Sequence, residues 1–527
     1  MIQRRHLLLA AATSLGAPSL AQGQSRQVLR FVPRADLAVL DPIWTTTYQT
    51  RDHAFLVFDT LFGMDAAFRA VPQMLEAAGT EADGLVWNLR LREGLRFHDN
   101  EMVRARDCAA SIRRWGRRDT FGQALMEATE EITAPDDRTI RIRLKRPFPL
   151  LPDALGKVPS NPCVIMPERL AATDPYTAVT EMVGSGPYRF VASERVAGAR
   201  TVYERFAGYV PRADGPVEWT AGPKRAHFER IEWVVLPDAA TASAALQRGE
   251  VDWWLGPEAD LLPLLRRNRR VTVRQIDPTG YIGNLRFNHL HPPFNNPAIR
   301  RALLAAISQS DFMQAVVGND PELWRDRVGT FCPGTPMESD AGMEALNGPR
   351  DLQAASQALR AAGYNGERVV VLGGVDIPII RSLTEVAADV MRRMGMNVDY
   401  QAIDWPTVVQ RRARTEPPEA GGWSVFCTWF TGLDHLNPAV HAFLRGNGRQ
   451  ATAGWPDSPR IEAARDTWLT APDLPAQQRI AAQLQRDALE DLPYIPLGQT
   501  RNMSAFRSDL EGIVTGIPVF WNLRRAA

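Results

Sequence analysis

The chain has 527 residues, a formal net charge of +1, 45% hydrophobic residues and 23% charged residues. This length predicts more than one folded lobe, and the composition is typical of a globular protein. The near-zero net charge argues against a nucleic acid or a membrane surface as the partner, because both attract strongly basic proteins.

The N-terminal residues have the pattern of a secretion signal. Arg4 and Arg5 supply a positive region, a short apolar run follows, and Ser19-Leu20-Ala21 is a small-x-small cleavage site. We therefore expect residues 1–21 to be a signal peptide and the mature chain to be periplasmic, after export by the Sec or the twin-arginine route. That oxidising compartment permits disulfides, but the spacing does not pair Cys108, Cys163, Cys332 and Cys427.

The stretch Trp87–Trp115 contains two periodicities. Apolar and polar residues alternate at its start and again at 95–97, which predicts a two-stranded hairpin with one apolar face. Asn100 lies in a tight loop and is a residue that accepts a positive φ. From Asp107 the period changes to that of an amphipathic helix, whose buried stripe is formed by Cys108, Ile112 and Trp115. We expect Cys108 to be a buried free thiol.

Strand and helix patterns alternate through the rest of the chain. Residues 239–248 predict a helix that ends at a glycine. Strand, helix and strand patterns over 368–372, 378–394 and 396–403 predict a right-handed crossover and a parallel strand pair. A last strand at 494–497 is expected to carry the chain back to the first lobe.

Several motifs match those of a known family, in the same order. Within 87–111 the matching residues are Trp87, Leu91, Arg92, Gly94, Phe97, His98, Asp99, Ala105, Asp107 and Ser111. Other matches are Leu40-Asp41-Pro42, Gly184-Ser185-Gly186-Pro187-Tyr188 and Arg300-Arg301-Ala302-Leu303. The chain thus resembles the extracytoplasmic solute-binding proteins of family 5, the dipeptide- and oligopeptide-binding type that serves peptide and nickel ABC importers. It departs from them at Asn100, where glycine is usual, and at Arg104, where a helix-capping threonine is usual.

The resemblance implies an α/β fold of the periplasmic-binding-protein type, with two lobes of class II (cluster C) and an extra subdomain in the first lobe. It assigns residues 22–57, 183–277 and 498–527 to lobe I, residues 58–182 to the extra subdomain and residues 278–497 to lobe II. The solute is then expected in the cleft between the lobes, which close by a hinge motion. We expect a monomer that needs no metal ion or other cofactor.

The sequence contains no catalytic motif of the G-x-S-x-G, H-E-x-x-H or P-loop kind. His289 with His291, and His435 with His441, would bind a metal only if a carboxylate joined them; otherwise they are ordinary strand-end and loop histidines. The resemblance favours the substrate-binding component of an ABC importer, which captures a peptide or peptide-like solute and delivers it to the membrane permease. The alternatives are a secreted hydrolase of peptides or esters, and a sensory or chaperone-like module on the same fold.

The candidates for solute contact are Tyr48, Trp254, Tyr281, Trp429 and Asp434. Because neighbours on a strand point to opposite faces, Trp254 is expected to face the cleft while Trp253 enters the core, unless both pack in the core. Tyr281 follows the crossing into the second lobe and either borders the solute or packs in the hinge. Tyr48 lies in a polar run that either reaches the cleft or forms an exposed loop.

The segment Thr428–Pro438 resembles the family segment in which an aspartate receives the solute's amino group. Counting back from Pro438 places Asp434 on that aspartate, whereas counting forward from Trp429 gives Gly432. A buried ammonium requires a carboxylate partner, and an adjacent tryptophan face adds a cation–π attraction of about 0.5–2 kcal/mol. The alternative is that Asp434 only caps a turn.

Overall fold

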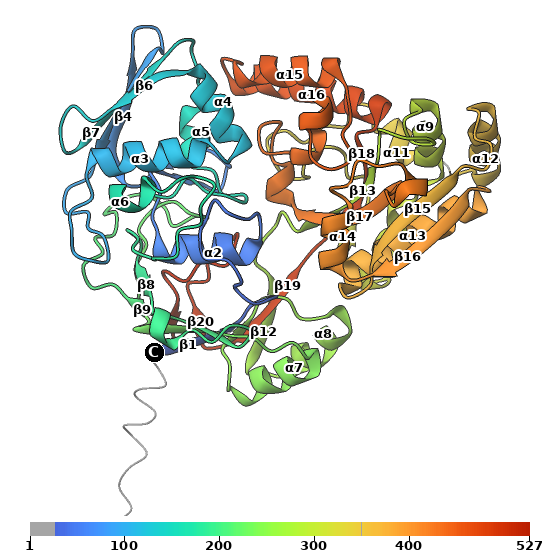
Figure 1. The fold of residues 1–527 in the computed structure, drawn as a ribbon. Coiled ribbons are helices and arrows are strands. Elements are labelled where there is room, and N and C mark those ends of the chain that lie inside the picture. The colour runs from blue at the N-terminus through green and yellow to red at the C-terminus, as the bar shows by residue number, and fades with distance from the viewer. Residues whose placement is uncertain (1–26, 349, 527) are drawn as a thin grey trace, which may run out of the picture.

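The computed structural model describes residues 27–348 and 350–526. The predicted signal peptide, residues 1–21, lies outside the described residues. Three sheets of four or more strands organise that part of the chain, each in a different region of the molecule (Figure 1). Over the same residues, no helix has both the length and the apolar character needed to cross a membrane.

A seven-stranded sheet forms the base of the first lobe, in the order β12-β19-β11-β1-β10-β9-β8. Its central strand β1 runs parallel to both β10 and β11, and helices α7 and α8 lie beside it (Figure 1). The predicted helix at 239–248 is confirmed as α7. The elements of this lobe are β1 (Val28–Val32), α2 (Tyr48–Val57), β8 (Tyr188–Phe190), β9 (Arg200–Arg205), β10 (Arg230–Val234), α7 (Ala239–Arg248), β11 (Trp253–Trp254), α8 (Leu262–Arg267), β12 (Val271–Gln275), β19 (Met503–Arg507), β20 (Leu510–Glu511) and β21 (Arg524–Arg525).

A six-stranded sheet forms the second lobe, in the order β14-β18-β13-β17-β15-β16. Strands β15 and β16 are parallel and joined through α13, so the predicted parallel pair is confirmed. Its elements are β13 (Tyr281–Phe287), α9 (Pro297–Ala306), α10 (Gln309–Val317), β14 (Trp324–Arg325), α11 (Glu344–Asn347), α12 (Leu352–Ala361), β15 (Arg368–Gly374), α13 (Pro378–Arg393), β16 (Asn397–Ile403), α14 (Trp405–Arg411), β17 (Val425–Thr431), α15 (Pro459–Leu469), α16 (Leu474–Asp491) and β18 (Tyr494–Thr500).

The third sheet has four strands in the order β4-β5-β7-β6 and belongs to the segment assigned to the extra subdomain. The hairpin predicted over residues 87–97 is wrong: β5 pairs with β4 before it and β7 after it, and 95–97 contributes one isolated bridge. The helix predicted from Asp107 is confirmed as α3, and Asn100 has a φ of 69°. The elements here are β2 (Phe62–Met64), β3 (Ala70–Pro72), β4 (Leu75–Glu81), β5 (Val86–Leu91), α3 (Ala105–Gly116), α4 (Thr120–Ala128), β6 (Thr129–Thr133), β7 (Thr139–Leu144), α5 (Leu151–Leu155) and α6 (Glu168–Ala171).

The missing threonine cap at Arg104 is compensated from within the helix. The Asp107 carboxylate accepts a hydrogen bond from the Arg104 backbone N–H at 2.8 Å, and its other oxygen accepts one from the Glu168 N–H at 2.8 Å. A carboxylate in the first turn also interacts favourably with the helix dipole. One side chain therefore ties the start of α3 to α6.

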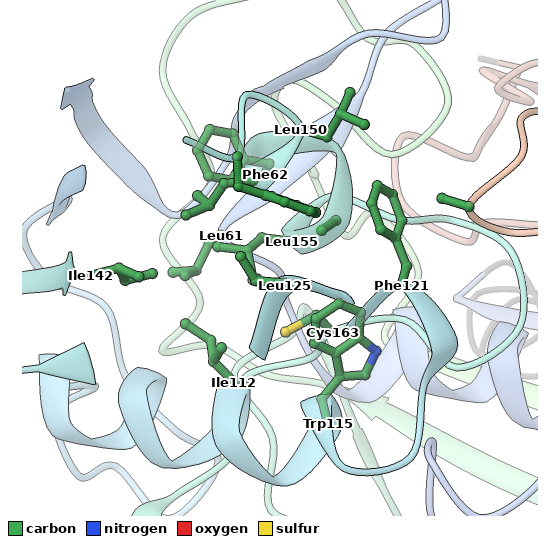
Figure 2. Close-up of a cluster of buried hydrophobic side chains, with 14 of the residues drawn as sticks. Leu61, Phe62, Ile112, Trp115, Phe121, Leu125, Ile142, Leu150, Leu155 and Cys163 are labelled. Atoms are coloured by element: carbon green, nitrogen blue, oxygen red, sulfur yellow. The ribbon is translucent and has the colours of Figure 1, made fainter. Parts of the chain in front are cut away.

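The apolar stripe of α3 packs into a continuous core. Ile112 and Trp115 meet the side chains of Phe121 and Leu125 from α4, with Leu155 of α5 opposite them (Figure 2). The same buried cluster continues into the second lobe, where it includes the α15 and α16 residues Ile461, Trp468, Ala481 and Leu484. The subdomain therefore touches the second lobe, and the structure has its lobes closed on each other.

The four cysteines provide a direct test of this packing. All four are buried free thiols, so the prediction for Cys108 is confirmed. Burial raises the pKa of the Cys427 thiol to about 12, which keeps it protonated and unreactive at neutral pH. We expect no thiol to react with a maleimide in the native protein and all four to react after denaturation in guanidinium, as counted by mass spectrometry. Modification of a native thiol would contradict this packing.

Candidate functional site

Two short segments connect the lobes, and the backbone there is tightly held. In the first, Gly280 has a φ of 54°, and a Cβ at this position would lie 2.1 Å from the carbonyl oxygen of Thr500 in the second. Glycine is therefore required by both conformation and space. The Asp277 carboxylate accepts hydrogen bonds from the backbone N–H and the hydroxyl of Thr279, at 2.8 and 2.6 Å. These contacts fix the direction in which β13 leaves the junction.

Three aromatic rings meet directly beside this junction. Tyr281 is the first residue of β13, and its ring centroid lies 4.1 Å from that of Trp429 on β17. The two are diagonal neighbours on paired strands, because Tyr281 lies opposite Thr431. Tyr48, the first residue of α2 in the other lobe, lies 5.6 Å from Trp429 and stacks on Tyr281 at 6.3 Å. Both lobes therefore contribute to one aromatic cluster.

Asp434 lies at the edge of this aromatic cluster, in the short turn after β17. Its Oδ2 atom accepts hydrogen bonds from the Tyr48 hydroxyl and from the Thr431 hydroxyl, both at 2.7 Å. The Thr431 backbone N–H donates to the Tyr48 oxygen at 2.9 Å. Burial, and then the Asp434 charge, raise the pKa of the Tyr48 hydroxyl well above its ordinary value, so it remains a donor.

The second oxygen of Asp434 has a different role in the structure. No described residue donates a hydrogen bond to Oδ1, while Oδ2 has two donors. A carboxylate oxygen accepts up to two hydrogen bonds, so Oδ1 offers its full capacity to a donor from outside the chain. The Trp429 ring of the adjoining aromatic cluster provides a flat apolar face, which suits a cationic group.

Two arginines add charge on the lobe I side of the same junction. The Arg51 guanidinium lies 5.0 Å from the Tyr48 ring centroid, and its Nε and Nη2 donate to Asp52 Oδ1 at 3.0 and 2.8 Å. The Arg34 guanidinium lies 4.8 Å from the Tyr281 ring centroid. Burial raises the pKa of the Asp52 carboxyl to about 6, against the opposing effect of Arg51. Burial likewise raises the pKa of Asp277.

Sequence reasoning missed these charged residues. Arg51 and Asp52 precede Ala54-Phe55-Leu56-Val57 on α2, where every residue from Thr50 to Val57 is buried. The sequence did contain a signal for them, namely two adjacent charged residues in a helix that has no apolar stripe. Such a helix is buried on all sides, and it accommodates a charge only where that charge is paired. Arg34 follows β1 in a loop and carried no such signal.

Trp254 is not part of this cluster, and the cleft-facing prediction for it is wrong. Trp253 and Trp254 are 1% and 5% exposed. They point to opposite faces, as expected for neighbours on a strand, but β11 lies inside the sheet between β1 and β19, and both faces are covered. Trp253 packs against Phe31 and Phe520, whereas Trp254 packs with residues of α7 and α8. The sequence alternative in which both tryptophans enter the core is therefore correct.

The paired histidines belong to other networks. His435 and His441 lie with ring centroids 4.1 Å apart, and His441 Nε2 is 2.7 Å from the Tyr494 hydroxyl. Burial lowers the pKa of His435 to about 4, which keeps this ring neutral. His289 contacts a backbone carbonyl of Pro493. Among the residues that the structure describes, no three His, Cys, Asp or Glu side chains gather as a metal site would require.

Comparison with known proteins agrees with the two-lobed arrangement. The family model described as "Bacterial extracellular solute-binding proteins, family 5 Middle" matches residues 69–449. The chain belongs to this family. A Sinorhizobium fredii protein named "Probable peptide ABC transporter periplasmic-binding protein y4tO" is 34% identical to this family 5 protein over 534 residues, with 100% of both chains covered.

Solved structures of similar fold also belong to periplasmic binding proteins. The protein AgaA in complex with agropinic acid, from A. tumefaciens R10, has a TM-score of 0.79 at 18% identity, covering 95% of this chain and 99% of that one. DppA from Helicobacter pylori in complex with the peptide STSA has a TM-score of 0.78 at 19% identity, covering 96% and 100%. At such identities the likeness shows the fold, and the predicted two-lobed α/β class is confirmed.

The hydrogen bond between Tyr48 and Asp434 joins the two lobes of the family 5 protein, and its removal gives a test of closure. Tyr48→Phe deletes the hydroxyl but keeps the ring, so we expect the closed form to lose about 1.5–3 kcal/mol, as for a hydrogen bond to a charged group. Small-angle X-ray scattering without solute should show a larger radius of gyration. Tyr176→Phe, at a tyrosine that is 60% exposed, is the control. An unchanged scattering curve for Tyr48→Phe would show that this bond does not hold the lobes together.

Proposed function

We propose that this protein is the periplasmic substrate-binding component of an ABC importer, which captures a peptide or peptide-like solute between its lobes and delivers it to the membrane permease. The observation that carries the proposal is the Asp434 carboxylate. It lies among Tyr48, Tyr281 and Trp429 where the lobes meet, and its Oδ1 has no donor among the described residues. The name of the Sinorhizobium relative and the bound peptide of the DppA structure support a peptide-like solute.

The chemistry of the junction suits an ammonium group. Asp434 supplies a negative acceptor, and Trp429 and Tyr48 supply aromatic faces that attract a cation and exclude water. Closure of the lobes around the solute places both partners in a low-dielectric environment, where the ion pair is stronger than in water. We assign the contacts with the ammonium end of the solute to Tyr48, Tyr281, Trp429 and Asp434.

The proposal also covers the oligomeric state, the absence of enzymatic activity, the export route and the domain boundaries. We propose a monomer without enzymatic activity, exported by the Sec or the twin-arginine route. We also propose residues 22–57, 183–277 and 498–527 as lobe I, residues 58–182 as the extra subdomain and residues 278–497 as lobe II. The three large sheets support this division, although β18 continues in the second sheet as far as Thr500, beyond the boundary at 497.

A thermal-shift screen tests the proposed function. The panel contains dipeptides, tripeptides, glutathione, opines and metal chelates, each added to the mature protein. A solute at about 100 times its dissociation constant is expected to stabilise the protein by about 2.7 kcal/mol. No shift with any peptide-like compound would overturn the proposal. Incubation with the same peptides, followed by mass spectrometry, separates binding from hydrolysis, because a hydrolase would release fragments.

A further inference from the structure

The connection between α8 and β12 carries a local excess of positive charge. Residues 261–275 contain five arginines and no acidic residue. The total charge of +1, from which the sequence argued against a membrane surface, does not show this excess. Four of the five arginines are exposed and close together in the chain, and we call them the α8 arginine cluster: Arg266, Arg267, Arg269 and Arg270.

The backbone holds the cluster at the surface, at the lower edge of the first lobe (Figure 1). Leu265 anchors α8, because it is fully buried against residues of α7. After the helix, the Val271 N–H donates to the Asn268 carbonyl oxygen at 2.9 Å, and the Arg270 N–H donates to the Asn268 side-chain oxygen at 3.0 Å. These bonds close a β-turn whose two central residues are Arg269 and Arg270. The cluster therefore lies on a well-defined outward corner.

The charges of the cluster are almost entirely without counter-ions. Over residues 27–348 and 350–526, Arg267 and Arg269 make no ion pair and no side-chain hydrogen bond, and Arg270 bonds only one backbone carbonyl. Arg266 has one acidic neighbour, Glu322, at 3.6 Å, and that side chain is 72% exposed. Like charges this close repel one another, so a negatively charged partner from outside the chain would be attracted to this corner.

The other side chains of the corner favour a membrane surface over a protein partner. Leu264 is 47% exposed on α8, one helical turn before Arg267. Residues 261–275 contain no aromatic side chain, whereas protein interfaces depend on tryptophan and tyrosine anchors that fill pockets. Arginines around an exposed leucine are sufficient for a flat anionic lipid surface, which attracts the charges and accepts the apolar side chain.

We infer that the α8 arginine cluster, together with Leu264, binds the anionic phospholipid surface of a membrane. This inference goes beyond the proposed function and takes from it only the setting, a protein that works beside a membrane permease. The cluster lies at the end of β12 far from the junction of the lobes, so the solute site stays separate from it. Electrostatic attachment of this kind is reversible, and it would concentrate the protein at the membrane.

Co-sedimentation of the mature protein with lipid vesicles tests the inference. One set of vesicles contains phosphatidylglycerol and phosphatidylethanolamine, and the other contains phosphatidylcholine alone. We expect binding to the first set only, and release by added salt, because salt screens exposed charges. Arg267→Gln with Arg269→Gln should lower the partition coefficient about 25-fold, since each arginine near an anionic surface contributes about fivefold. Leu264→Ser should also lower it.

Arg392→Gln with Arg393→Gln is the matched control. These two adjacent arginines are exposed at the end of α13 in the second lobe, so the change in net charge is the same. The control should bind the anionic vesicles as the wild-type protein does, and all variants should keep the wild-type melting temperature because the altered side chains are exposed.

Three results would overturn the inference: no binding of the wild-type protein to the anionic vesicles, equal binding to both sets, or an equal loss in the two double variants. Binding to the permease in phosphatidylcholine vesicles, lost in Arg267→Gln with Arg269→Gln and without any binding to anionic lipid, would assign the cluster to a protein partner and overturn it as well. Each of these results leaves the proposed function standing, because the thermal-shift screen measures solute binding without lipid.

Discussion

Asp434→Asn is expected to weaken the binding of an amine-bearing solute by about 2–5 kcal/mol, which is at least about thirtyfold in the dissociation constant. Asparagine has nearly the same shape and still accepts the hydrogen bonds of Tyr48 and Thr431 through its oxygen. It lacks the charge, so the solute's ammonium would be buried without a counter-ion. Isothermal titration calorimetry with the tightest compound from the thermal-shift screen measures the change.

Asp466→Asn provides the control for this experiment. Asp466 is exposed on α15 in the same lobe and lies outside the junction, so its substitution makes the same chemical change away from the site. Its dissociation constant should match that of the wild-type protein. Equal affinities for Asp434→Asn and the wild-type protein would exclude Asp434 from the binding site and remove the observation on which the proposed function depends.

Asp41→Ala is expected to lower the free energy of unfolding by about 3–5 kcal/mol. Asp41 follows β1, and its oxygens lie 3.2 and 2.7 Å from Nη1 and Nη2 of Arg114 on α3, with side chains that are 0% and 3% exposed. It also accepts the Val179 backbone N–H at 2.7 Å. The substitution leaves a buried guanidinium without its counter-ion, where the first lobe meets the subdomain. Denaturant unfolding followed by tryptophan fluorescence measures the loss.

The double substitution Asp41→Leu with Arg114→Met separates two explanations of that loss. Replacing both charges with apolar groups removes the uncompensated guanidinium, so much of the stability should return. Glu250→Ala, in the exposed pair with Arg248, should leave the unfolding midpoint unchanged. A small effect of Asp41→Ala, comparable to that of Glu250→Ala, would show that water reaches Arg114 and that the pair is not a structural tie.

The elements that the sequence predicted well depend on local contacts. The helix α3, the positive φ of Asn100 and the crossover from β15 through α13 to β16 follow from periodicity and turn chemistry within a few tens of residues. The hairpin over 87–97 failed because the partner strands of β5 were β4 and β7. The alternation identified the strand correctly, but it carries no information about which strand lies beside it.

The candidate site was likewise predicted in part, and some of its residues were missed or misassigned. Tyr48, Tyr281, Trp429 and Asp434 were identified mainly through a family resemblance, and the structure brings these four together from segments far apart in the chain. Arg34 and Arg51 were missed, because an arginine in a sequence does not show whether its counter-ion lies nearby in space. Trp254 was misassigned because residue alternation distinguishes two faces of a sheet but does not say which of them is covered.

The bond between Tyr48 and Asp434 also bears on the speed of capture. Tyr48 belongs to one lobe and Asp434 to the other. The carboxylate that we assign to the solute's ammonium therefore also holds the two lobes together. A solute gains access only in the fraction of molecules in which this bond is broken, so the association rate falls in proportion to that fraction. The same bond lengthens the lifetime of the closed form. The protein therefore binds its solute more slowly and also releases it more slowly.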